Sequence, residues 1–373
     1  MSQKYRVAII GSTGRGNYGH GIDVVWKDFP DQVEVVAIAD PNEAGRIKAQ
    51  AQTGASRAYV DYHEMLEREK PQIVAVGPRW VDQHADMVIA AAQHGCHVYM
   101  EKPLCRTLEE ADRMVAACEK AKVQLAIAHI SRYSPLISVA QKIIADGLLG
   151  NLLEMRARGK EDHKRGGIED LWVLGSHLMN LMTVFAGEPL TCSASLKNQN
   201  HPMTASDLVE GGEGLGPMGA DAVHARYEFA KGVTGDFASV RGQAGNPWRF
   251  AIQLFGSKGI LEIPSGYLEP VYFLADPSWS PNRSGKKWET VSSAGVGVPE
   301  PRKDRGNHFG NVAAVKDLLL AIQEQREPLC GVHAARTTIE MIMAVFESHR
   351  QGGGPVKFPL QERRHPLTLL KQS

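Results

Sequence analysis

Residues 6–16 read RVAIIGSTGRG, an apolar run that leads directly into three closely spaced glycines, Gly11, Gly14 and Gly16. Glycines at the end of a strand let the chain turn tightly and let backbone N–H groups approach a pyrophosphate. We expect a helix to follow, because its N-terminus would add partial positive charge beside the phosphates. The spacing is G-x-x-G-x-G rather than G-x-G-x-x-G, so the glycines are a weak signal without the strand before them. Together they predict a doubly wound, dinucleotide-binding unit.

The first 128 residues alternate apolar runs with helical patterns. Five runs rich in Val, Ile and Ala fit strands of a parallel sheet that is buried on both faces. They are residues 6–10, 33–39, 72–76, 97–100 and 124–128. Helical patterns lie between them at 43–52, 82–94 and 107–120, and Thr107 with Glu110 predicts a capping box at the start of the last one. The alternation predicts an α/β Rossmann domain over residues 1–128.

The pattern changes after about residue 150. Strand-like segments follow one another with few helices between them, at residues 152–158, 222–229, 233–240, 250–256 and 260–263. Such a run predicts a largely antiparallel open sheet, and hence an α+β domain over residues 129–373 for substrate binding and oligomerisation. Residues 276–307 are rich in Pro, Ser and Gly and predict a long loop. Helical patterns return at 311–323 and 334–351, and these last helices could pack back on the first domain.

The bulk composition excludes several classes of protein. The 373 residues fit about two domains, and 42 basic against 42 acidic side chains leave no basic surplus for nucleic acid or acidic membranes. No apolar run reaches the roughly 18 residues of a membrane-spanning helix, and the first residues do not form a signal peptide, so we expect a cytoplasmic protein. The five cysteines are scattered without a CxxC pair, which favours reduced thiols without catalytic or disulfide roles.

Asp40 ends the second apolar run and bears on the choice of cofactor. An acidic side chain there can accept hydrogen bonds from the adenosine ribose hydroxyls and repels a 2′-phosphate, which favours NAD over NADP. Arg15 and Arg46 keep NADP open, since either could reach such a phosphate. The alternative is a nucleotide-free domain in which Asp40 caps the helix that follows.

Several motifs, in a fixed order, resemble one oxidoreductase family. Glu101-Lys102-Pro103 follows the fourth strand, and Gly175-Ser176-His177 lies in the second domain. The other motifs are Gly77-Pro78 with His84-Ala85, the stretch 131–135 with 147–150, the stretch 255–262, and Pro355-Val356-Lys357-Phe358-Pro359 at the end. The set resembles the glucose-fructose oxidoreductase/inositol dehydrogenase/rhizopine-catabolism family over nearly the whole chain.

The resemblance implies an NAD(P)-dependent dehydrogenase or reductase of a sugar, cyclitol or related polyol, assembled as a homodimer or homotetramer. His177 would be the acid/base and Lys102 would stabilise the developing alkoxide. The resemblance and the glycine loop together imply a set of cofactor contacts. These residues are Gly11, Ser12, Thr13, Gly14, Arg15, Gly16, Asp40, Pro78, His84, Glu101, Lys102 and Arg132. The resemblance and the polar residues near these motifs together imply substrate contacts from Lys102, His129, His163, Asp170, Trp172 and His177.

The sequence departs from the family pattern around His177. Many members carry an acid where this chain has Val173, and another where it has Asn180. Asp170 precedes His177 by seven residues, about two helical turns, so the two could share one face of a helix. The polar stretch 160–167 falls where the substrate loop would lie. We expect no metal site, because Asp162, His163 and His177 lack a tight ligand spacing.

Two other functions remain open from the sequence. The altered acids are compatible with an NAD-dependent glycosidase that oxidises its substrate transiently, with no net redox change. The third hypothesis is a non-catalytic NAD(P)-binding regulator, against which the pair Lys102 and His177 argues.

Overall fold

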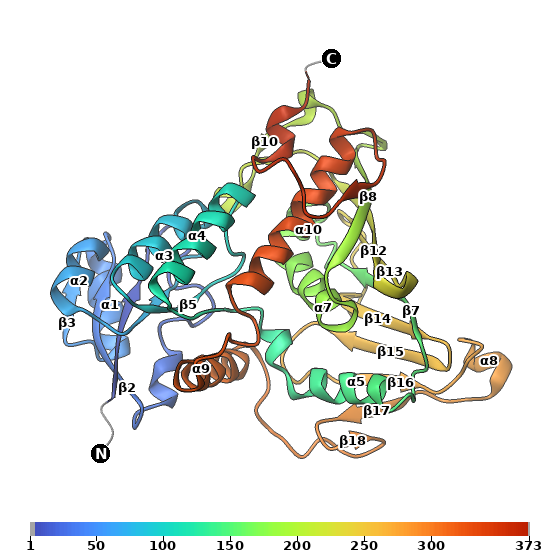
Figure 1. Cartoon of the computed structure of the whole chain (residues 1–373), viewed down its shortest axis with the longest axis horizontal. Coiled ribbons are helices and arrows are strands. Elements are labelled where there is room, and N and C mark those ends of the chain that lie inside the picture. Colours follow the sequence, from blue (N-terminus) through green and yellow to red (C-terminus); the bar gives the residue numbers. More distant parts are fainter. Residues whose placement is uncertain (1–3, 372–373) are drawn as a thin grey trace. The chain divides into compact units, whose positions relative to one another are not determined.

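The computed structural model describes residues 4–371, which form two compact units. The first comprises the described residues up to Ile130, together with Gly212–Gly216 and Asn307–Ile339. The second comprises Ser131–Gly211, Pro217–Gly306 and the described residues from Glu340 onward (Figure 1). Each unit therefore contains segments that are distant in the sequence.

The first unit is built on a six-stranded parallel sheet in the order β3-β2-β1-β4-β5-β6. Its strands are β1 (Tyr5–Ile10), β2 (Val33–Ala39), β3 (Arg57–Tyr59), β4 (Ile73–Val76), β5 (His97–Met100) and β6 (Leu125–Ile127). The strand order reverses between β1 and β4, and in such sheets ligands bind beyond the carboxyl ends of the strands at that point. Gly11 and Gly77 follow those two strands. The five predicted strands are confirmed, and only the short β3 was missed.

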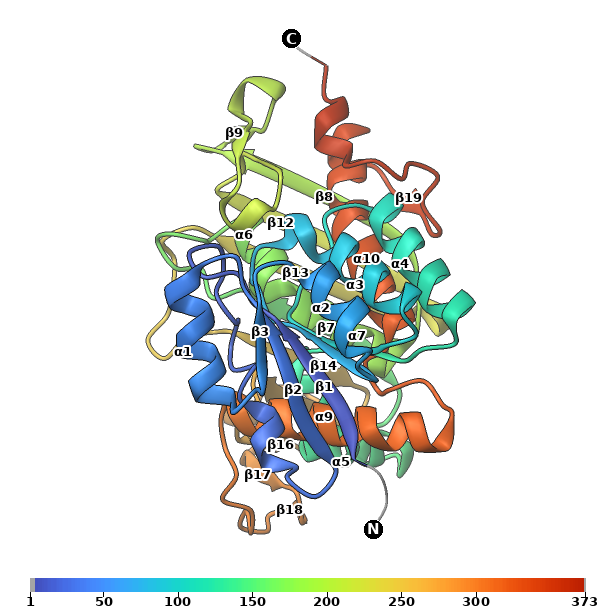
Figure 2. The same cartoon turned by 90° about the vertical axis from the view of Figure 1, so that its left-hand side faces the viewer.

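Helices cover both faces of this sheet. Figure 2 shows α1 (Glu43–Thr53) on one side, with α2 (Tyr62–Glu69), α3 (His84–Gln93) and α4 (Leu108–Ala121) on the other. The late helix α9 (Asn307–Glu324) packs against β5, β6 and the short 3₁₀ helix η1 (Val25–Asp28). At the start of α4 the Thr107 side chain accepts from Glu110 N, at 3.2 Å, which is half of the predicted capping box. The Glu110 carboxylate instead binds Arg106.

The helix expected after the glycine loop does not form. Residues 12–24 are turns and bends, and η1 is the first helical segment among the described residues. The reason lies in the glycines themselves, because Gly14, Gly16, Gly19 and Gly21 have φ of +88°, +90°, +62° and +93°. A right-handed helix cannot continue through such residues. The predicted charge of a helix N-terminus is therefore absent from this loop.

The second unit contains an eleven-stranded sheet that is largely antiparallel, as predicted; only the β7–β13 pair is parallel. The predicted strands correspond to β7 (Leu152–Arg158), β12 (Ala222–Phe229), β13 (Thr234–Val240), β14 (Ala251–Gly256) and β15 (Gly259–Pro264). The prediction missed β8 (Pro189–Asn198), whose polar sequence hides its alternating burial, and β16 (Val271–Leu274). It also missed β17 (Glu289–Ser292) and β18 (Gly295–Val296), which extend the sheet from within the expected loop.

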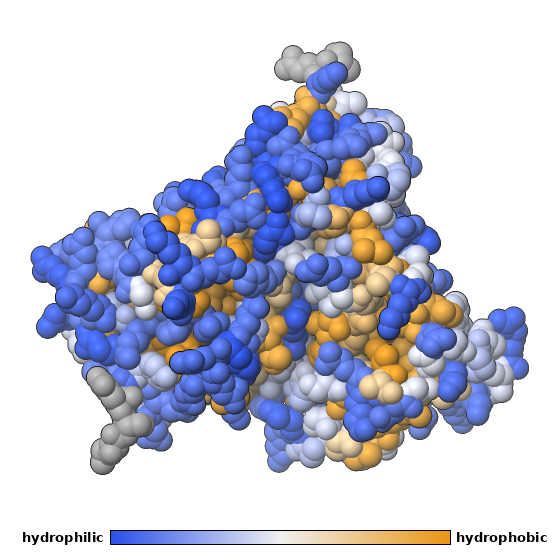
Figure 3. Space-filling view, in the orientation of Figure 1, coloured by the Kyte–Doolittle hydropathy of each residue, from blue (hydrophilic) through white to orange (hydrophobic). Residues whose placement is uncertain are grey.

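One face of the second sheet is buried and the other is open. Burial alternates strictly along β12 and β13, and inward-facing Tyr227 donates to the Met341 carbonyl of α10 (Val332–Arg350) at 3.0 Å. On the face shown in Figure 3, hydrophobic residues of this unit gather over α5 (Pro135–Ala145) and the strands beside it. In residues 4–371, no helix has both the length and the apolar character needed to cross a bilayer.

Candidate active site

The glycine loop is a compact hairpin held by its own hydrogen bonds. Ser12 N donates to Asn17 O at 3.0 Å, and Asn17 N returns a bond to Ser12 O at 2.9 Å. Arg15 N also donates to Ser12 O, at 2.9 Å, and Gly14 N donates to the Asn17 side chain at 3.1 Å. Three backbone donors that the sequence assigned to the cofactor, those of Ser12, Gly14 and Arg15, are therefore used inside the loop.

Asp40 anchors this loop to the end of β2. Its carboxylate is fully buried and accepts from Thr13 N at 3.1–3.2 Å, Thr13 Oγ1 at 2.7 Å and Asn42 N at 2.9 Å. Arg46 donates to the backbone carbonyl of Asp40 at 2.8 Å, so its guanidinium lies beside the same strand end. Burial near the Asp40 carboxylate raises the pKa of Tyr18. The predicted ribose-binding acid thus also fixes the shape of the loop.

The first unit fits a dinucleotide in some respects and differs in others. The reversal of strand order between β1 and β4 fits, as do Asp40 at the end of β2 and the open space beside Gly14, where an added Cβ would meet nothing within 4 Å. The glycine loop differs, because no helix directly follows it and several of its backbone N–H groups donate hydrogen bonds within the loop.

Glu101 organises the carboxyl end of β5. It is 1% exposed, and its Oε1 accepts from His20 N at 3.1 Å and from the His20 ring at Nδ1. Its Oε2 accepts from Lys102 N at 2.7 Å. Burial alone would raise the pKa of Glu101, but the His20 hydrogen bond and the Lys102 charge outweigh it and lower the pKa to about 2. The carboxylate therefore stays ionised and holds both neighbours.

His84 ties together the loops that follow β4 and β5. The ring is fully buried, with Nε2 2.7 Å from Pro78 O and Nδ1 2.9 Å from Pro103 O. Pro78 takes part through its carbonyl, and Lys102 immediately precedes Pro103. His84 is thus a positioning residue for the Lys102 loop, held away from solvent.

His129 lies in the core of the first unit. It is 1% exposed, and its Nδ1 lies 3.6 Å from the Cys330 sulfur. All five cysteines are buried, and none of them forms a disulfide. His84 and His129 are both buried, whereas His20, which the sequence analysis did not single out, is exposed at this end of the sheet.

Arg132 and His177 belong to the second unit. Arg132 Nη1 lies 3.3 Å from Asn180 Oδ1 and 3.4 Å from Thr183 Oγ1, both on α7 (Ser176–Ala186). His177 is 9% exposed, near the start of the same helix. Arg132, which was assigned to the cofactor, therefore fixes the helix that carries His177, and Asn180 is its partner where the family commonly has an acid.

Asp170 and His177 do not share a helix face. A π-helical segment, η4 (Leu171–Gly175), separates α6 (Ile168–Asp170) from α7. A π turn holds about one residue more than an α turn, so the seven-residue spacing no longer closes two turns. Asp170 is instead buried, where its Oδ2 accepts from Ser239 at 2.6 Å and from Glu161 N at 3.0 Å. The predicted alignment is wrong because of this local helix geometry.

The polar stretch 160–167 is held by bonds among its own residues and by ion pairs with residues outside it. Glu161 is fully buried and binds Arg158 and Arg249 at 2.7 and 2.9 Å, while Asp162 accepts from Arg165 N at 2.7 Å. His163 is exposed. Among residues 4–371, no group of three or more His, Cys, Asp or Glu side chains is arranged to hold a metal ion.

Trp172 is a packing residue. Its indole is fully buried and lies 6.1 Å from the Phe346 ring and 6.2 Å from the His365 ring. It presents no face on which a sugar could lie. The substrate contact that the resemblance implied for Trp172 therefore has no support in this packing.

The segment Gly212–Gly216 is another feature that the sequence reasoning missed. It comes from the second half of the chain but belongs to the first unit. Glu213 lies 3.5 Å from Arg79, and Gly214 packs on Asp82, which pairs with Arg15 of the glycine loop. The many glycines between 211 and 219 were the only signal of an unusual segment.

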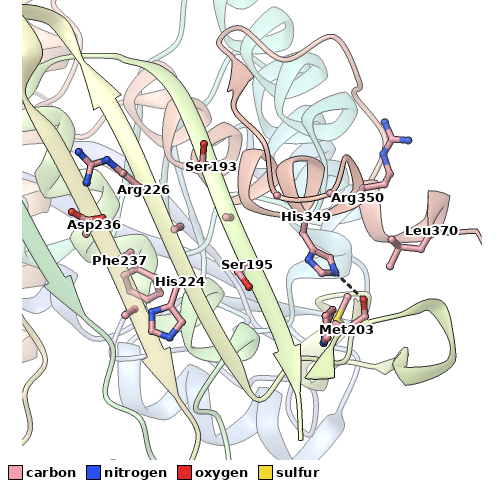
Figure 4. A pocket seen from close by; sticks show the side chains of 16 residues that line it. Ser193, Ser195, Met203, His224, Arg226, Asp236, Phe237, His349, Arg350 and Leu370 are labelled. Carbon is pink, nitrogen blue, oxygen red and sulfur yellow. Dashed lines mark hydrogen bonds between the residues drawn. The ribbon is translucent and has the colours of Figure 1, made fainter. Parts of the chain in front are cut away.

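A groove of about 690 Å³ lies on the second unit, along β8, β12, β13 and the end of α10. Figure 4 shows His224, Arg226 and Asp236 on the sheet, and His349 bonded to the Met203 carbonyl at 2.9 Å. None of the residues expected to contact substrate contributes to its lining.

Residues 5–129 match the family described as "Oxidoreductase family, NAD-binding Rossmann fold", and residues 154–358 match its "C-terminal alpha/beta domain". The chain belongs to this oxidoreductase family. Its first unit is thus the NAD-binding domain of the family, as the motifs around Glu101-Lys102-Pro103 indicated.

Similar proteins include sugar dehydrogenases. The chain is 26% identical over 250 residues to levoglucosan dehydrogenase of Pseudarthrobacter phenanthrenivorans, covering 61% of this chain and 63% of that protein. It is 28% identical over 220 residues to D-apiose dehydrogenase of Paraburkholderia graminis, covering 56% of each. The alignments thus span less than two thirds of these curated relatives. A levoglucosan dehydrogenase structure with NADH and L-sorbose has a TM-score of 0.78 at 20% identity, covering 96% of this chain and 100% of that one, which shows a shared fold.

Proposed function

We propose that this protein is an NAD-dependent dehydrogenase that exchanges hydride with a hydroxyl carbon of a sugar, cyclitol or related polyol. The observation that carries the proposal is the family match over both domains, together with relatives named for levoglucosan and D-apiose. We assign NAD(P) binding to residues 1–128, and substrate binding with oligomerisation to residues 129–373.

Bound NAD would accept the hydride of the alcohol carbon. The protein must then take the hydroxyl proton and stabilise the negative charge that develops on oxygen. An imidazole is suited to the first task near neutral pH, and we assign it to His177. A lysine ammonium is suited to the second, and we assign it to Lys102, whose backbone is fixed by Glu101 and whose loop is fixed by His84.

The preference for NAD over NADP rests on Asp40. A 2′-phosphate would meet a buried carboxylate at the end of β2, while Arg46 already donates to the carbonyl of the same residue. Asp40 would disfavour NADP partly by repelling the 2′-phosphate and partly by holding Thr13 and the glycine loop in place. NADP remains the second candidate because Arg15 and Arg46 lie in or near this region.

The substrate class is tested with a panel of polyols, aldoses and glycosides, followed for both NADH and released sugar. NADH formed in proportion to polyol consumed supports the dehydrogenase. Glycoside cleavage without NADH would support the transient-oxidation glycosidase, which the dehydrogenase relatives do not favour. Cofactor binding with no turnover on any compound would indicate a regulator instead.

A homodimer or homotetramer remains our proposal for the assembly. The open face of the second sheet and the hydrophobic surface over α5 support it, because contiguous apolar surface marks contact sites. Sedimentation of the purified protein measures the assembly directly, and a monomer at micromolar concentration would contradict the proposal.

A further inference from the structure

The amide side chain of Asn311 connects a late helix to the residues that hold Lys102. Asn311 lies near the start of α9, and only 1% of it is exposed. Its Oδ1 accepts from the Tyr99 hydroxyl on β5 at 2.8 Å, and its Nδ2 donates to the His20 carbonyl at 2.9 Å. Asparagine favours a helix interior less than most residues do, and a buried amide needs hydrogen-bond partners. The side chain is therefore fixed at both ends of its amide.

The segment that this amide holds, Gly19–Gly21, packs against the ends of β4 and β5. A Cβ on Gly19 would lie 2.6 Å from the Gly77 carbonyl oxygen and 2.6 Å from Glu101 Cγ, so a side chain there would clash with both. Gly19 also has a φ of +62°, which favours glycine. His20 N donates to Glu101 Oε1 at 3.1 Å, and the His20 ring contacts the same oxygen through Nδ1. The backbone bond does not depend on the protonation of the ring.

The Glu101 carboxylate links His20 to Lys102. Its Oε1 takes the two contacts from His20, while its Oε2 accepts from Lys102 N at 2.7 Å. On the other side of Lys102, His84 Nδ1 lies 2.9 Å from the Pro103 carbonyl oxygen. The backbone at Lys102 is thus held from both sides, through Glu101 and through Pro103. A shift of His20 would turn the Glu101 carboxylate, and the backbone of Lys102 would move with it.

We propose that Asn311 is a positioning residue for Lys102. It acts through His20 and Glu101, and so sets where the Lys102 ammonium lies. The proposal rests on the proposed function, in which Lys102 stabilises the developing alkoxide. Displacing a group that acts in the transition state by about 1 Å can lower turnover on the order of a hundredfold. An amide that only filled the core would instead affect the stability of the fold and leave the chemistry at Lys102 unchanged.

A double-mutant cycle on turnover tests this proposal. Asn311→Leu keeps a similar side-chain volume and loses both hydrogen bonds, so we expect kcat on the best polyol to fall about tenfold to a hundredfold. In a Lys102→Ala background the same substitution should cause no further loss, because the group that it positions is absent. Asn307→Ala, at an exposed position of the same helix, is the control and should leave kcat unchanged. An equal loss in both backgrounds would overturn the proposal.

A second measurement needs no substrate. The full-length protein is labelled with acetic anhydride, and mass spectrometry follows the rate at Lys102 relative to Lys48, an exposed lysine of the same unit. Losing the hydrogen bonds of Asn311 should free the loop, so the relative rate at Lys102 should rise about fivefold in Asn311→Leu. Thermal unfolding checks the fold, and Asn311→Ala replaces Asn311→Leu if the larger residue prevents folding. An unchanged labelling rate at Lys102 in a folded variant would overturn the proposal.

The two measurements separate this proposal from the dehydrogenase assignment. A protein that oxidises no polyol, but whose Lys102 is labelled faster in Asn311→Leu, supports the role of Asn311 in holding Lys102 and refutes the substrate class. A protein that oxidises a polyol with the same kcat in its unmodified and Asn311→Leu forms supports the enzyme and refutes the role of Asn311.

Discussion

His20 and His177 sit in opposite chemical settings. The ring of His20 contacts a buried, ionised carboxylate, whereas His177 lies on a helix where the acids common in the family are replaced by Val173 and Asn180. A buried acid fixes the position of the first ring, whereas the second ring depends on the helix α7 that carries it. His20 is therefore a fixed part of the first unit, while His177 is the residue to which we assign proton transfer.

Among the variants considered, His177→Ala is expected to lower turnover the most. Loss of a general base typically lowers turnover by about two to four orders of magnitude, and the fall in rate on the acid side should disappear with it. Rate measurements on the best polyol across pH check this. His129→Ala is the control and should keep the acidic limb. Near-normal turnover with the limb unchanged would break the contrast and make His20 the first candidate for the base.

Lys102→Ala should cause the second-largest loss of turnover. Removing a group that stabilises developing negative charge costs about 2.7–4 kcal/mol, roughly two to three orders of magnitude in turnover. The fold should survive, because Glu101 binds the backbone N–H of this residue, which alanine keeps. Steady-state kinetics alongside thermal unfolding measures both. A change of less than about fivefold on the true substrate would remove Lys102 from the reaction.

Glu101→Gln should lower the free energy of unfolding, because it removes a buried carboxylate that stabilises the folded protein. The pKa of Glu101 is about 2 in the folded protein against a usual 4.5, so its stabilisation is present above about pH 4.5 and is lost as pH falls through 2. The difference in unfolding free energy between the two proteins should be on the order of 3 kcal/mol near neutral pH and shrink towards pH 2. Urea unfolding at several pH values measures it. A difference independent of pH would mean that Glu101 is not held ionised by its neighbours.

Asp40→Ala should weaken NAD and reduce the discrimination against NADP. The substitution removes the acceptor of Thr13 and Asn42 as well as the charge that repels a 2′-phosphate. Hydrogen bonds to charged groups contribute about 1.5–3 kcal/mol, so NAD affinity should fall roughly tenfold to a hundredfold. Parallel NADH and NADPH titrations check both parts. Equal or tighter NADPH binding by the unmodified protein would refute the NAD preference.

The smallest effect is expected from Arg132→Ala, which separates structural support from cofactor binding. Arg132 contacts Asn180 and Thr183, so its loss should lower the melting temperature by a few degrees. NADH affinity should stay within about twofold if the residue only supports α7. Lys142→Ala, which removes an exposed ion pair with Asp146, is the matched control and should change neither quantity. A large loss of NADH affinity would restore Arg132 to the cofactor site.

The sequence by itself determined the architecture. The runs at 6–10, 33–39 and 97–100 are apolar enough to be buried on both faces, so their burial is specified locally and β1, β2 and β5 form where predicted. The ordered motifs around Glu101-Lys102-Pro103 and Gly175-Ser176-His177 indicated the family, which the comparisons show. Short or polar strands such as β3 and β8 were missed because they depend on neighbours in the sheet rather than on their own pattern.

Only the tertiary structure decided what the polar side chains do. Asp170 and Trp172 look like binding residues in the sequence, but the first is a buried acceptor for Ser239 and the second is a core aromatic. Asp40 has a second role that the sequence does not show, because it also anchors the glycine loop. The π segment at Leu171–Gly175 shifts the spacing of Asp170 and His177, and no residue type marks such a segment. His20 was overlooked because its partner Glu101 lies 81 residues away in the sequence. A side chain's contacts depend on residues brought together by folding, whereas a buried strand is already specified by its own apolar residues.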